Sequence, residues 1–439
     1  MANGLRKVKE ISPARLAAFN ILQQVETGAF SSVLLASEEL RLQPADRALS
    51  HELVLGVLRW QLYLDKIIEH FSKRRIESLD AAVRIALRLG LYQLRFLTRI
   101  PASAAVNESV SLVRVARLTS ATAFVNALLR RAIREAEYDP SVTVSDPLER
   151  IAVQTSHPHW LIERWARSFG VAEAAAFAQA NNVVPPAAFR VVARKANDSA
   201  VLSKLNEAGA TLESSNVAQG AWRVSGATSV LRELTAAGEI YLQDEASQLV
   251  AQIVDAKPGE RVLDLCAAPG GKTTQLADRS DDRALIVAGD ISETRMDTIL
   301  TTMRLHELES IKPVLLDATK QLPFAPRSFD NVLVDAPCSG TGTLRRNPEI
   351  RWRLSPDDIT TLAAQQKRIL GRAIELVKPG GHLIYSTCSV EYDENEQVIQ
   401  DVLATDARFR PLNTIRTWPH REGSDGFFIT VFEAADFRR

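Results

Sequence analysis

Hydrophobic residues recur every three or four positions through the first third of the chain, which is the spacing of helices with one buried face. Prolines separate these segments, and the alternation typical of strands is lacking. The pattern therefore predicts an all-α domain over residues 1–140. Its expected helices cover residues 14–27, 45–71, 80–97, 105–118 and 122–137.

The middle of the chain has a mixed pattern. Residues 139–148 contain two prolines and little periodicity, which is typical of a linker. Beyond them, helical stretches alternate with short runs of β-branched residues. We expect a small α+β module over residues 145–237.

From residue 238 onward, short apolar runs alternate with helical stretches. This order predicts a parallel, doubly wound sheet with helices on both faces, an α/β domain over residues 238–439. Ligands of such sheets bind beyond the carboxyl ends of the strands. The expected strands are residues 262–265, 284–288, 313–316, 331–334, 383–385 and 427–432.

Composition narrows the class of protein. The chain lacks an apolar stretch of membrane-spanning length, and no apolar segment follows its basic N-terminus, so we expect a cytoplasmic protein without membrane attachment. Three widely spaced cysteines fit neither a disulfide framework nor a metal site. The seven histidines also lack metal-ligand spacing, so no bound metal is expected.

Charge is distributed unevenly along the chain. Lys+Arg and Asp+Glu balance at 53 each, but basic residues are in excess within residues 1–140. Such an excess indicates an anionic partner, with arginines on a phosphate-binding face. Charge alone favours the alternative that these are solvated helix faces. The arginines concerned are Arg84, Arg88, Arg95, Arg99, Arg114, Arg117, Arg130, Arg131 and Arg134.

A glycine-rich turn follows the first expected strand of the α/β domain. After Asp264 and Leu265 it reads Cys266, Ala267, Ala268, Pro269, Gly270, Gly271 and Lys272. A Walker A loop would need glycine in place of Cys266, and the G-x-G-x-x-G dinucleotide fingerprint is missing. Adjacent glycines after an acidic residue suit a cationic ligand without phosphates, such as S-adenosylmethionine.

Carboxylates also end the next two expected strands. Asp290 is suited to the ribose hydroxyls of that ligand, and Asp317 to the amine of its adenine. A single aspartate at a strand end is more often a helix N-cap than a ligand. Three strand-end carboxylates in register, Asp264 included, favour a cofactor site.

Two of the three cysteines follow the fourth and fifth expected strands. Carbon 5 of cytosine becomes nucleophilic when a thiolate adds to C6. The reaction needs that thiolate, a carboxyl group near N3 and N4, and a second acid–base group, which Cys388, Asp335 and Cys338 supply. Chemistry alone does not decide which cysteine attacks. The target base must leave its stack, so the RNA is expected to be single-stranded or to present a flipped cytosine.

The motifs around these residues resemble the RNA cytosine-C5 methyltransferases of the Nol1/Nop2/Sun family. The helical region resembles NusB-type RNA-binding domains, a combination found in bacterial family members that act on small-subunit (16S) ribosomal RNA. The matching motifs are Gln-Asp-Glu-Ala-Ser-Gln at 243–248, Cys-Ala-Ala-Pro-Gly-Gly-Lys-Thr at 266–273, Asp-Ala-Pro-Cys-Ser-Gly-Thr-Gly at 335–342, Arg-Arg-Asn-Pro-Glu at 345–349 and Ser-Thr-Cys-Ser at 386–389.

The resemblance implies a Rossmann-like class I methyltransferase domain, S-adenosylmethionine as cofactor and 16S ribosomal RNA as partner. Cys388 would be the nucleophile and Cys338 would assist product release, whereas Cys266 would be core filler beneath the cofactor turn. Residues 266–272, Asp290, Asp317 and Asp335 would line the cofactor and target pocket. We expect a monomer without a stable protein partner.

Several alternatives stay open at this point. Transfer RNA is the alternative substrate for the same reaction. An inactive binding protein is the alternative class, but it would show damaged motifs, and the motifs of this chain are intact. The spacing of the glycine turn excludes an ATPase or a dehydrogenase. Lys272 would cap a helix or touch substrate. Arg345, Arg346 and Arg351 would hold RNA phosphates or form surface salt bridges, and Trp352 and Trp418 would stack on bases or pack internally.

Overall fold

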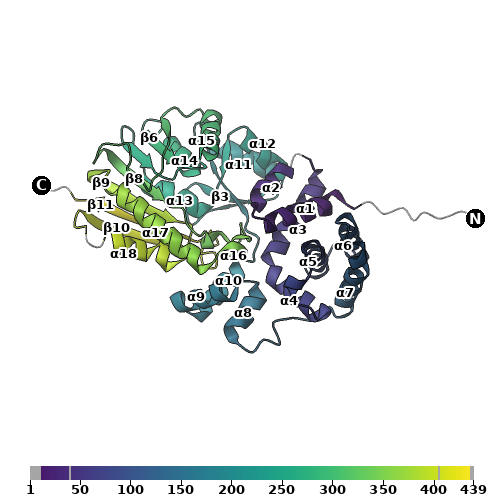
Figure 1. The fold of residues 1–439 in the computed structure, drawn as a ribbon. Helices are drawn as coiled ribbons and strands as arrows, with labels where there is room; N and C mark the ends of the chain where they lie inside the picture. The colour runs from purple at the N-terminus through teal and green to yellow at the C-terminus, as the bar shows by residue number, and fades with distance from the viewer. Residues whose placement is uncertain (1–10, 39–40, 404–405, 436–439) are drawn as a thin grey trace, which may run out of the picture. The chain divides into compact units, whose positions relative to one another are not determined.

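The computed structural model describes residues 11–38, 41–403 and 406–435, and the chain divides into two compact units (Figure 1). Unit 1 comprises Met1–Val183 and Leu344–Arg353, and unit 2 comprises Val184–Thr343 and Leu354–Arg439. The basic N-terminal segment, residues 1–10, lies outside the described residues. None of the helices described has the length and hydrophobicity needed to cross a bilayer.

Unit 1 is helical throughout its described part, as expected from the hydrophobic pattern. A single core joins residues from α1 to α7, among them Phe19, Leu64 and Leu129. The domain boundary expected near residue 140 stays a prediction, and α8 to α10 pack within unit 1. Its helices are α1 (Pro13–Glu26), α2 (Ser31–Glu38), α3 (Pro44–Arg59), α4 (Gln61–Ser72), η1 (Ile76–Ser78), α5 (Ala81–Phe96), α6 (Ala102–Val115), η2 (Thr119–Ala121), α7 (Thr122–Arg134), α8 (Pro147–Thr155), α9 (His159–Phe169), α10 (Val171–Ala180) and α16 (Ile350–Arg353).

The single helix predicted over residues 45–71 is wrong, because the chain turns at Trp60 between α3 and α4. The Trp60 ring stacks on Phe96, with 4.7 Å between centroids. The first amides of α4 are satisfied by a distant residue: Ser156 Oγ accepts from the Leu62 amide at 2.9 Å. Because the residue that caps α4 lies 94 positions away in the chain, the local sequence does not show that a new helix begins here.

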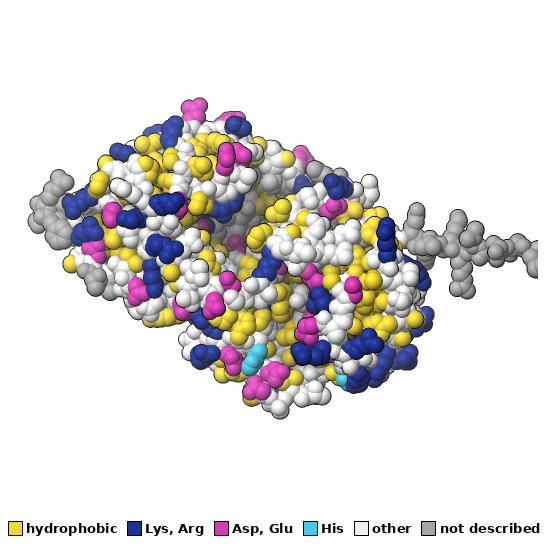
Figure 2. Space-filling model, viewed as in Figure 1, with side chains coloured by type: hydrophobic (Ala, Val, Ile, Leu, Met, Phe, Trp, Pro, Cys, Tyr) yellow, Lys and Arg dark blue, Asp and Glu magenta, His cyan; other side chains and the backbone are white. Residues whose placement is uncertain are grey.

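Some of the basic residues expected on a phosphate-binding face are structural. Arg88 is buried and donates to both oxygens of Asp65, at 2.7 and 2.8 Å. Its third contact is Glu26, which also pairs with Arg84. The phosphate-binding prediction is therefore wrong for Arg88. Lysine and arginine side chains still gather on the visible face of unit 1 (Figure 2), and the exposed arginines among those predicted are Arg99, Arg114, Arg117, Arg130 and Arg134.

The start of unit 2 confirms the small α+β module. Its elements follow the order β1 (Ala187–Val191), α11 (Asp198–Glu207), β2 (Thr211–Ser214), β3 (Ala221–Ser225), α12 (Thr228–Ala236) and β4 (Ile240–Leu242). They form an antiparallel sheet of order β2-β3-β1-β4. Phe189, Leu205 and Leu234 fill its core.

The rest of unit 2 confirms the α/β domain with a mixed sheet of order β10-β11-β9-β8-β5-β6-β7. Side chains alternate between its faces, so Leu383 packs toward α17 and α18, and Ile384 packs toward α13, α14 and α15 (Figure 1). The strands are β5 (Arg261–Asp264), β6 (Leu285–Asp290), β7 (Ile311–Leu315), β8 (Phe329–Asp335), β9 (Val377–Thr387), β10 (Phe409–Thr417) and β11 (Phe427–Ala434), and the helices are α13 (Glu245–Val254), α14 (Gly271–Arg279), α15 (Glu293–His306), η3 (Thr341–Thr343), α17 (Pro356–Ala373), η4 (Tyr392–Glu394) and α18 (Glu396–Leu403).

The sheet departs from the fully parallel arrangement expected from the sequence. β5 to β9 run parallel, but β10 and β11 form an antiparallel hairpin beside β9. β10 was not predicted, because this edge strand is mostly exposed and its sequence lacks an apolar run. The parallel strands bring the carboxyl ends of β5, β6 and β8 to the same edge of the sheet.

Replacing Asp65 by Ala is expected to lower the free energy of unfolding of unit 1 by about 3 kcal/mol, because the buried Arg88 loses its bidentate partner. Urea unfolding followed by circular dichroism measures this change. Glu26→Ala is the matched control, since it removes a partly exposed partner of the same arginine and is expected to cost about 1 kcal/mol or less. Equal losses for the two variants would contradict a buried pair between Asp65 and Arg88.

Candidate active site

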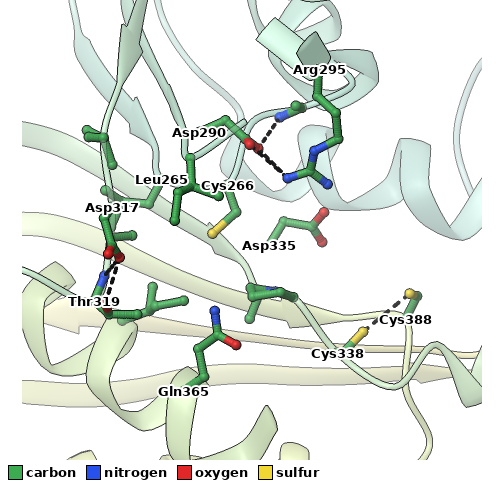
Figure 3. Close-up of a pocket in the computed structure, with 17 residues that line it drawn as sticks. Leu265, Cys266, Asp290, Arg295, Asp317, Thr319, Asp335, Cys338, Gln365 and Cys388 are labelled. Atoms are coloured by element: carbon green, nitrogen blue, oxygen red, sulfur yellow. Dashed lines mark hydrogen bonds and ion pairs between the residues drawn. The ribbon is translucent and has the colours of Figure 1, made fainter. Parts of the chain in front are cut away.

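A pocket of about 240 Å³ opens at the carboxyl ends of β5, β6 and β8 (Figure 3). Apolar side chains such as Leu316 and Ile369 line part of it, and carboxylates and thiols line the rest. Of the residues predicted from the sequence, it brings together Cys266, Ala268, Asp290, Asp317, Asp335, Cys338 and Cys388.

The glycine turn lies between β5 and α14. Gly270 has a φ of +103°, a conformation that favours glycine, and it precedes the first residue of α14. Gly271 lies so close to Tyr241 that a Cβ there would be 3.0 Å from a ring carbon. A larger residue at either position would therefore force the neighbouring side chains of Ile299 or Tyr241 to shift.

Asp290 and Asp317 occupy different environments in the pocket. The Asp290 carboxylate is buried and accepts hydrogen bonds from the amides of Ala268 and Ser292, at 3.1 and 2.9 Å. Arg295 contacts both of its oxygens, at 2.7 and 3.0 Å (Figure 3). Asp317 accepts from the amide and hydroxyl of Thr319, which hold its pKa below the ordinary value. Both carboxylates face the pocket, and Arg295 is an addition that the sequence pattern did not single out.

A second pocket, of about 180 Å³, shares Cys266, Ala268 and Asp335 with the first. Its lining includes Asp264 and Lys272. Cys266 thus lines both pockets and also packs against the hydrophobic core of the domain, so its role as core filler stays a prediction. The other predicted turn residues here are Ala267, Pro269 and Gly271.

Asp264 is buried under the glycine turn, and its Oδ2 accepts a hydrogen bond from the Thr273 hydroxyl at 2.8 Å. Burial raises the pKa of this carboxyl to about 7, and the nearby Asp335 adds to the rise. Within the described part of the chain, Oδ1 has no hydrogen-bond partner of normal geometry. A buried carboxylate with an unpaired oxygen is suited to bind a cationic group, such as the ammonium group of S-adenosylmethionine.

Cys338 and Cys388 face each other across the pocket rim, with 3.4 Å between their sulfur atoms (Figure 3). The contact with Cys388 and then burial raise the pKa of the Cys338 thiol well above its ordinary value. Cys338 therefore keeps its proton and is a poor nucleophile as long as this contact persists.

Asp335 lies between the cofactor turn and the two thiols. Its Oδ2 is 2.7 Å from Lys272 Nζ, and its Oδ1 accepts from the Ser386 hydroxyl at 2.8 Å. Burial lowers the pKa of Lys272, but Asp335 more than offsets this, so the net pKa is raised. Lys272 therefore carries its charge at the site and does not cap α14, whose first turn follows Gly270.

The acidic residue Glu394 joins the loops of the two cysteines, and sequence reasoning missed it. Its carboxylate accepts hydrogen bonds from the hydroxyls of Ser339 and Ser389, the residues directly after Cys338 and Cys388. It lies in a run of acidic and polar residues, 391–397, and nothing in that run marks one member as buried.

The segment after the Cys338 loop belongs to unit 1, and two of its three arginines singled out from the sequence are buried, whereas the role of the half-buried Arg346 stays a prediction. Arg351 is fully buried and donates to the carbonyl of Ser156 and to Asn182 Oδ1, at 3.1 and 3.0 Å. Both the phosphate and the surface salt-bridge predictions are therefore wrong for Arg351. Arg345 is also buried, and Trp352 donates to the Leu58 carbonyl at 2.6 Å, so the packed alternative holds for this tryptophan.

Trp418 in unit 2 also packs internally. This tryptophan is buried, with the guanidinium groups of Arg416 and Arg421 over its ring at 5.7 and 5.6 Å. The ring is thus already covered on the inside of unit 2, and stacking on a base is not its role in this structure.

Comparisons with known proteins match each part of the chain. Residues 251–433 match the family model "16S rRNA methyltransferase RsmB/F", residues 12–134 match the NusB family, and residues 157–231 match the ferredoxin-like domain of RsmF/B-like methyltransferases. The chain is 32% identical to the probable ribosomal RNA small subunit methyltransferase B of Bacillus subtilis (strain 168), over 96% of this chain and 98% of that protein.

Two further relatives cover nearly the whole chain. The ribosomal RNA small subunit methyltransferase B of Pseudomonas putida is 34% identical over 94% of this chain and 97% of its own length. Among solved structures, the crystal structure of PH0851 superimposes with a TM-score of 0.82 and 29% identity, over 97% of this chain and 99% of that one. The similarity therefore extends through all three sequence regions.

The raised pKa of Asp264 predicts a specific pH dependence of stability. Between the unfolded value of about 3.9 and the folded value of about 7, the folded protein keeps a proton that the unfolded chain has lost. The free energy of unfolding should therefore fall as the pH rises from 4 to 7, by up to about 4 kcal/mol, and then level off.

Asp264→Asn removes this titration without changing the size of the side chain. The difference in unfolding free energy between wild type and Asp264→Asn, measured by urea unfolding from pH 4 to 8, isolates the contribution of Asp264 from that of other groups. A difference that does not vary with pH would show that Asp264 has an ordinary pKa.

Proposed function

Since the chain belongs to the RsmB/F family of 16S rRNA methyltransferases, we propose that it transfers a methyl group from S-adenosylmethionine to C5 of a specific cytosine in 16S ribosomal RNA. S-adenosylmethionine is the cofactor of this family and fold. The observation that carries the choice of C5 is the pair of sulfur atoms, 3.4 Å apart, beside the Asp335 carboxylate. The cytoplasmic location and the monomeric state expected from the sequence stay predictions.

Cys388 is the nucleophile in this proposal. Its thiolate adds to C6 of a cytosine that has left its stack, and the electron density moves to C5. Chemistry alone left the choice between the two thiols open, and the family motifs imply Cys388 as the attacking one. The contact with Cys388 and then burial raise the pKa of the Cys338 thiol, which disfavours its thiolate form.

Asp335 and Lys272 bind the pyrimidine ring. The carboxylate accepts a hydrogen bond from the exocyclic N4 amine, and the ammonium group, 2.7 Å from that carboxylate, offsets negative charge that develops on the ring. Bound S-adenosylmethionine supplies the electrophilic methyl group that the activated C5 takes up. Once Cys388 is bonded to C6, its contact with the Cys338 thiol is lost. Cys338 then gives up its own proton to solvent and accepts the C5 proton, and the Cys388 thiolate leaves C6 as the double bond reforms.

We assign the cofactor-binding residues from the linings of the two pockets. Asp290 binds the ribose hydroxyls and Asp317 the adenine amine, while Asp264 faces the cationic end of the ligand from the second pocket. The backbone of residues 266–272 would lie close to the bound cofactor. Gly270 and Gly271 permit this approach because they have no side chains.

Asp290→Ala is expected to weaken the binding of S-adenosylhomocysteine by about 10- to 100-fold, because it removes a carboxylate acceptor from a buried position. Isothermal titration calorimetry measures the dissociation constant. Asp297→Ala, at an exposed position of the following helix α15, is the matched control and should bind like wild type. Unchanged affinity in Asp290→Ala would place the ribose elsewhere.

The reaction itself is tested with wild type, Cys338→Ala and Cys388→Ala, each incubated with S-adenosylmethionine and either small-subunit ribosomal RNA or transfer RNA. Mass spectrometry measures 5-methylcytosine, and a denaturing gel shows any covalent protein–RNA product. Wild type should methylate ribosomal RNA, Cys338→Ala should accumulate the covalent product, and Cys388→Ala should give neither.

Other outcomes have distinct meanings. Loss of the covalent product in Cys338→Ala, with retention in Cys388→Ala, would reverse the two roles. Methylation of transfer RNA alone would change the substrate. Methylation of ribosomal RNA at a position other than C5 of cytosine would overturn the reaction proposed for the thiol pair.

A further inference from the structure

Glu394 is a buried carboxylate that contacts both cysteine loops. It ends η4, its side chain is inaccessible to solvent, and burial raises its pKa. One oxygen accepts from the Ser339 amide at 2.8 Å and from Gln366 Nε2 at 3.0 Å. The other accepts from the hydroxyls of Ser339 and Ser389. Four donors thus converge on one carboxylate that touches neither cysteine.

The two loops depend on Glu394 to different extents. The Ser389 carbonyl is held separately by Asn395 Nδ2 at 2.9 Å, and the Thr387 hydroxyl fixes that asparagine at 2.6 Å. In contrast, the backbone amide and the hydroxyl of Ser339 both donate hydrogen bonds to the Glu394 carboxylate. Removing the carboxylate therefore releases the Cys338 loop more than the Cys388 loop.

We propose that Glu394 is a positioning residue that holds Cys338 beside Cys388 and thereby serves the release half of the reaction. This inference rests on the proposed function, in which Cys388 forms the covalent bond and Cys338 assists its cleavage. Glutamine in place of Glu394 offers one acceptor oxygen where the carboxylate offers two, so either the Ser339 amide or the two serine hydroxyls lose their buried acceptor, and the loop moves to find another one. The Cys338 thiol then leaves its position 3.4 Å from Cys388, while Cys388 still attacks.

The test compares Glu394→Gln with its neighbour variant Asn395→Ala, which loosens only the Cys388 side. Glu394→Gln should form the covalent RNA product at a rate near that of wild type and release it at least about 10-fold more slowly. It should lower kcat with little change in the KM for S-adenosylmethionine. Asn395→Ala should instead form less of the covalent product and should not accumulate it. Pulse–chase with labelled RNA on denaturing gels separates formation from release.

A second measurement needs neither RNA nor methylation. Diamide oxidises the two thiols to a disulfide by taking up their two hydrogen atoms, and the rate depends on how the sulfur atoms are placed. Mass spectrometry of Glu394→Gln should show this disulfide forming several-fold more slowly than in wild type. Ser339→Ala removes one hydroxyl donor and keeps Glu394, so it should slow release of the RNA product less than Glu394→Gln does. This variant replaces Glu394→Gln in the test if Glu394→Gln does not fold.

The outcomes separate this inference from the proposed function. Release and disulfide formation at wild-type rates in folded Glu394→Gln, or unchanged release in Ser339→Ala if that variant replaces it, would overturn the positioning role. Failure of Cys338→Ala to accumulate a covalent product would instead overturn the proposed cysteine roles. In that case the diamide rates still decide whether Glu394 holds the two thiols together.

Discussion

The parallel pairing of β8 with β9 places Asp335 opposite Ser386, and both cysteine loops begin just beyond this pair. The hydrogen bond from Ser386 to Asp335, 2.8 Å long, links the two strand ends through their side chains. The backbones of Gly342 and Gly426 are also in close contact: a Cβ added to Gly342 would lie 1.9 Å from the carbonyl oxygen of Gly426. The 3.4 Å spacing of the two sulfur atoms thus follows from strand register and close backbone packing together.

Two cations pair with carboxylates at this edge of the sheet, Arg295 with Asp290 and Lys272 with Asp335. The buried Asp264 nearby has a pKa raised to about 7 and accepts a hydrogen bond from the Thr273 hydroxyl. A positively charged cofactor suits this carboxylate, because it would favour the ionised form that burial disfavours. Glu394 lies apart from this charge cluster, and it accepts four donors, so its contribution is geometric.

Sequence patterns predicted the features that repeat locally or that end a strand. The buried strands, the glycine turn and the placement of Cys338 and Cys388 after β8 and β9 all follow from periodicity and chain order. Features that depend on residues far apart in the chain were missed: the turn at Trp60 needs Ser156, and Glu394 is marked only by its burial between two loops. Arg351 was misassigned for the same reason, since its carbonyl partners come from distant segments of unit 1.

In the proposed reaction, the Cys388 thiolate forms the bond to C6 and Cys338 lies beside it. The most direct measurement uses small-subunit ribosomal RNA that contains 5-fluorocytidine, because fluorine at C5 blocks the elimination that frees the enzyme. Peptide mapping of the trapped wild-type protein then identifies the residue that carries the nucleotide. We expect the nucleotide on the tryptic peptide that contains Cys388. A nucleotide on the peptide that contains Cys338, or a protein that is not trapped although it methylates the unmodified RNA, would contradict this expectation.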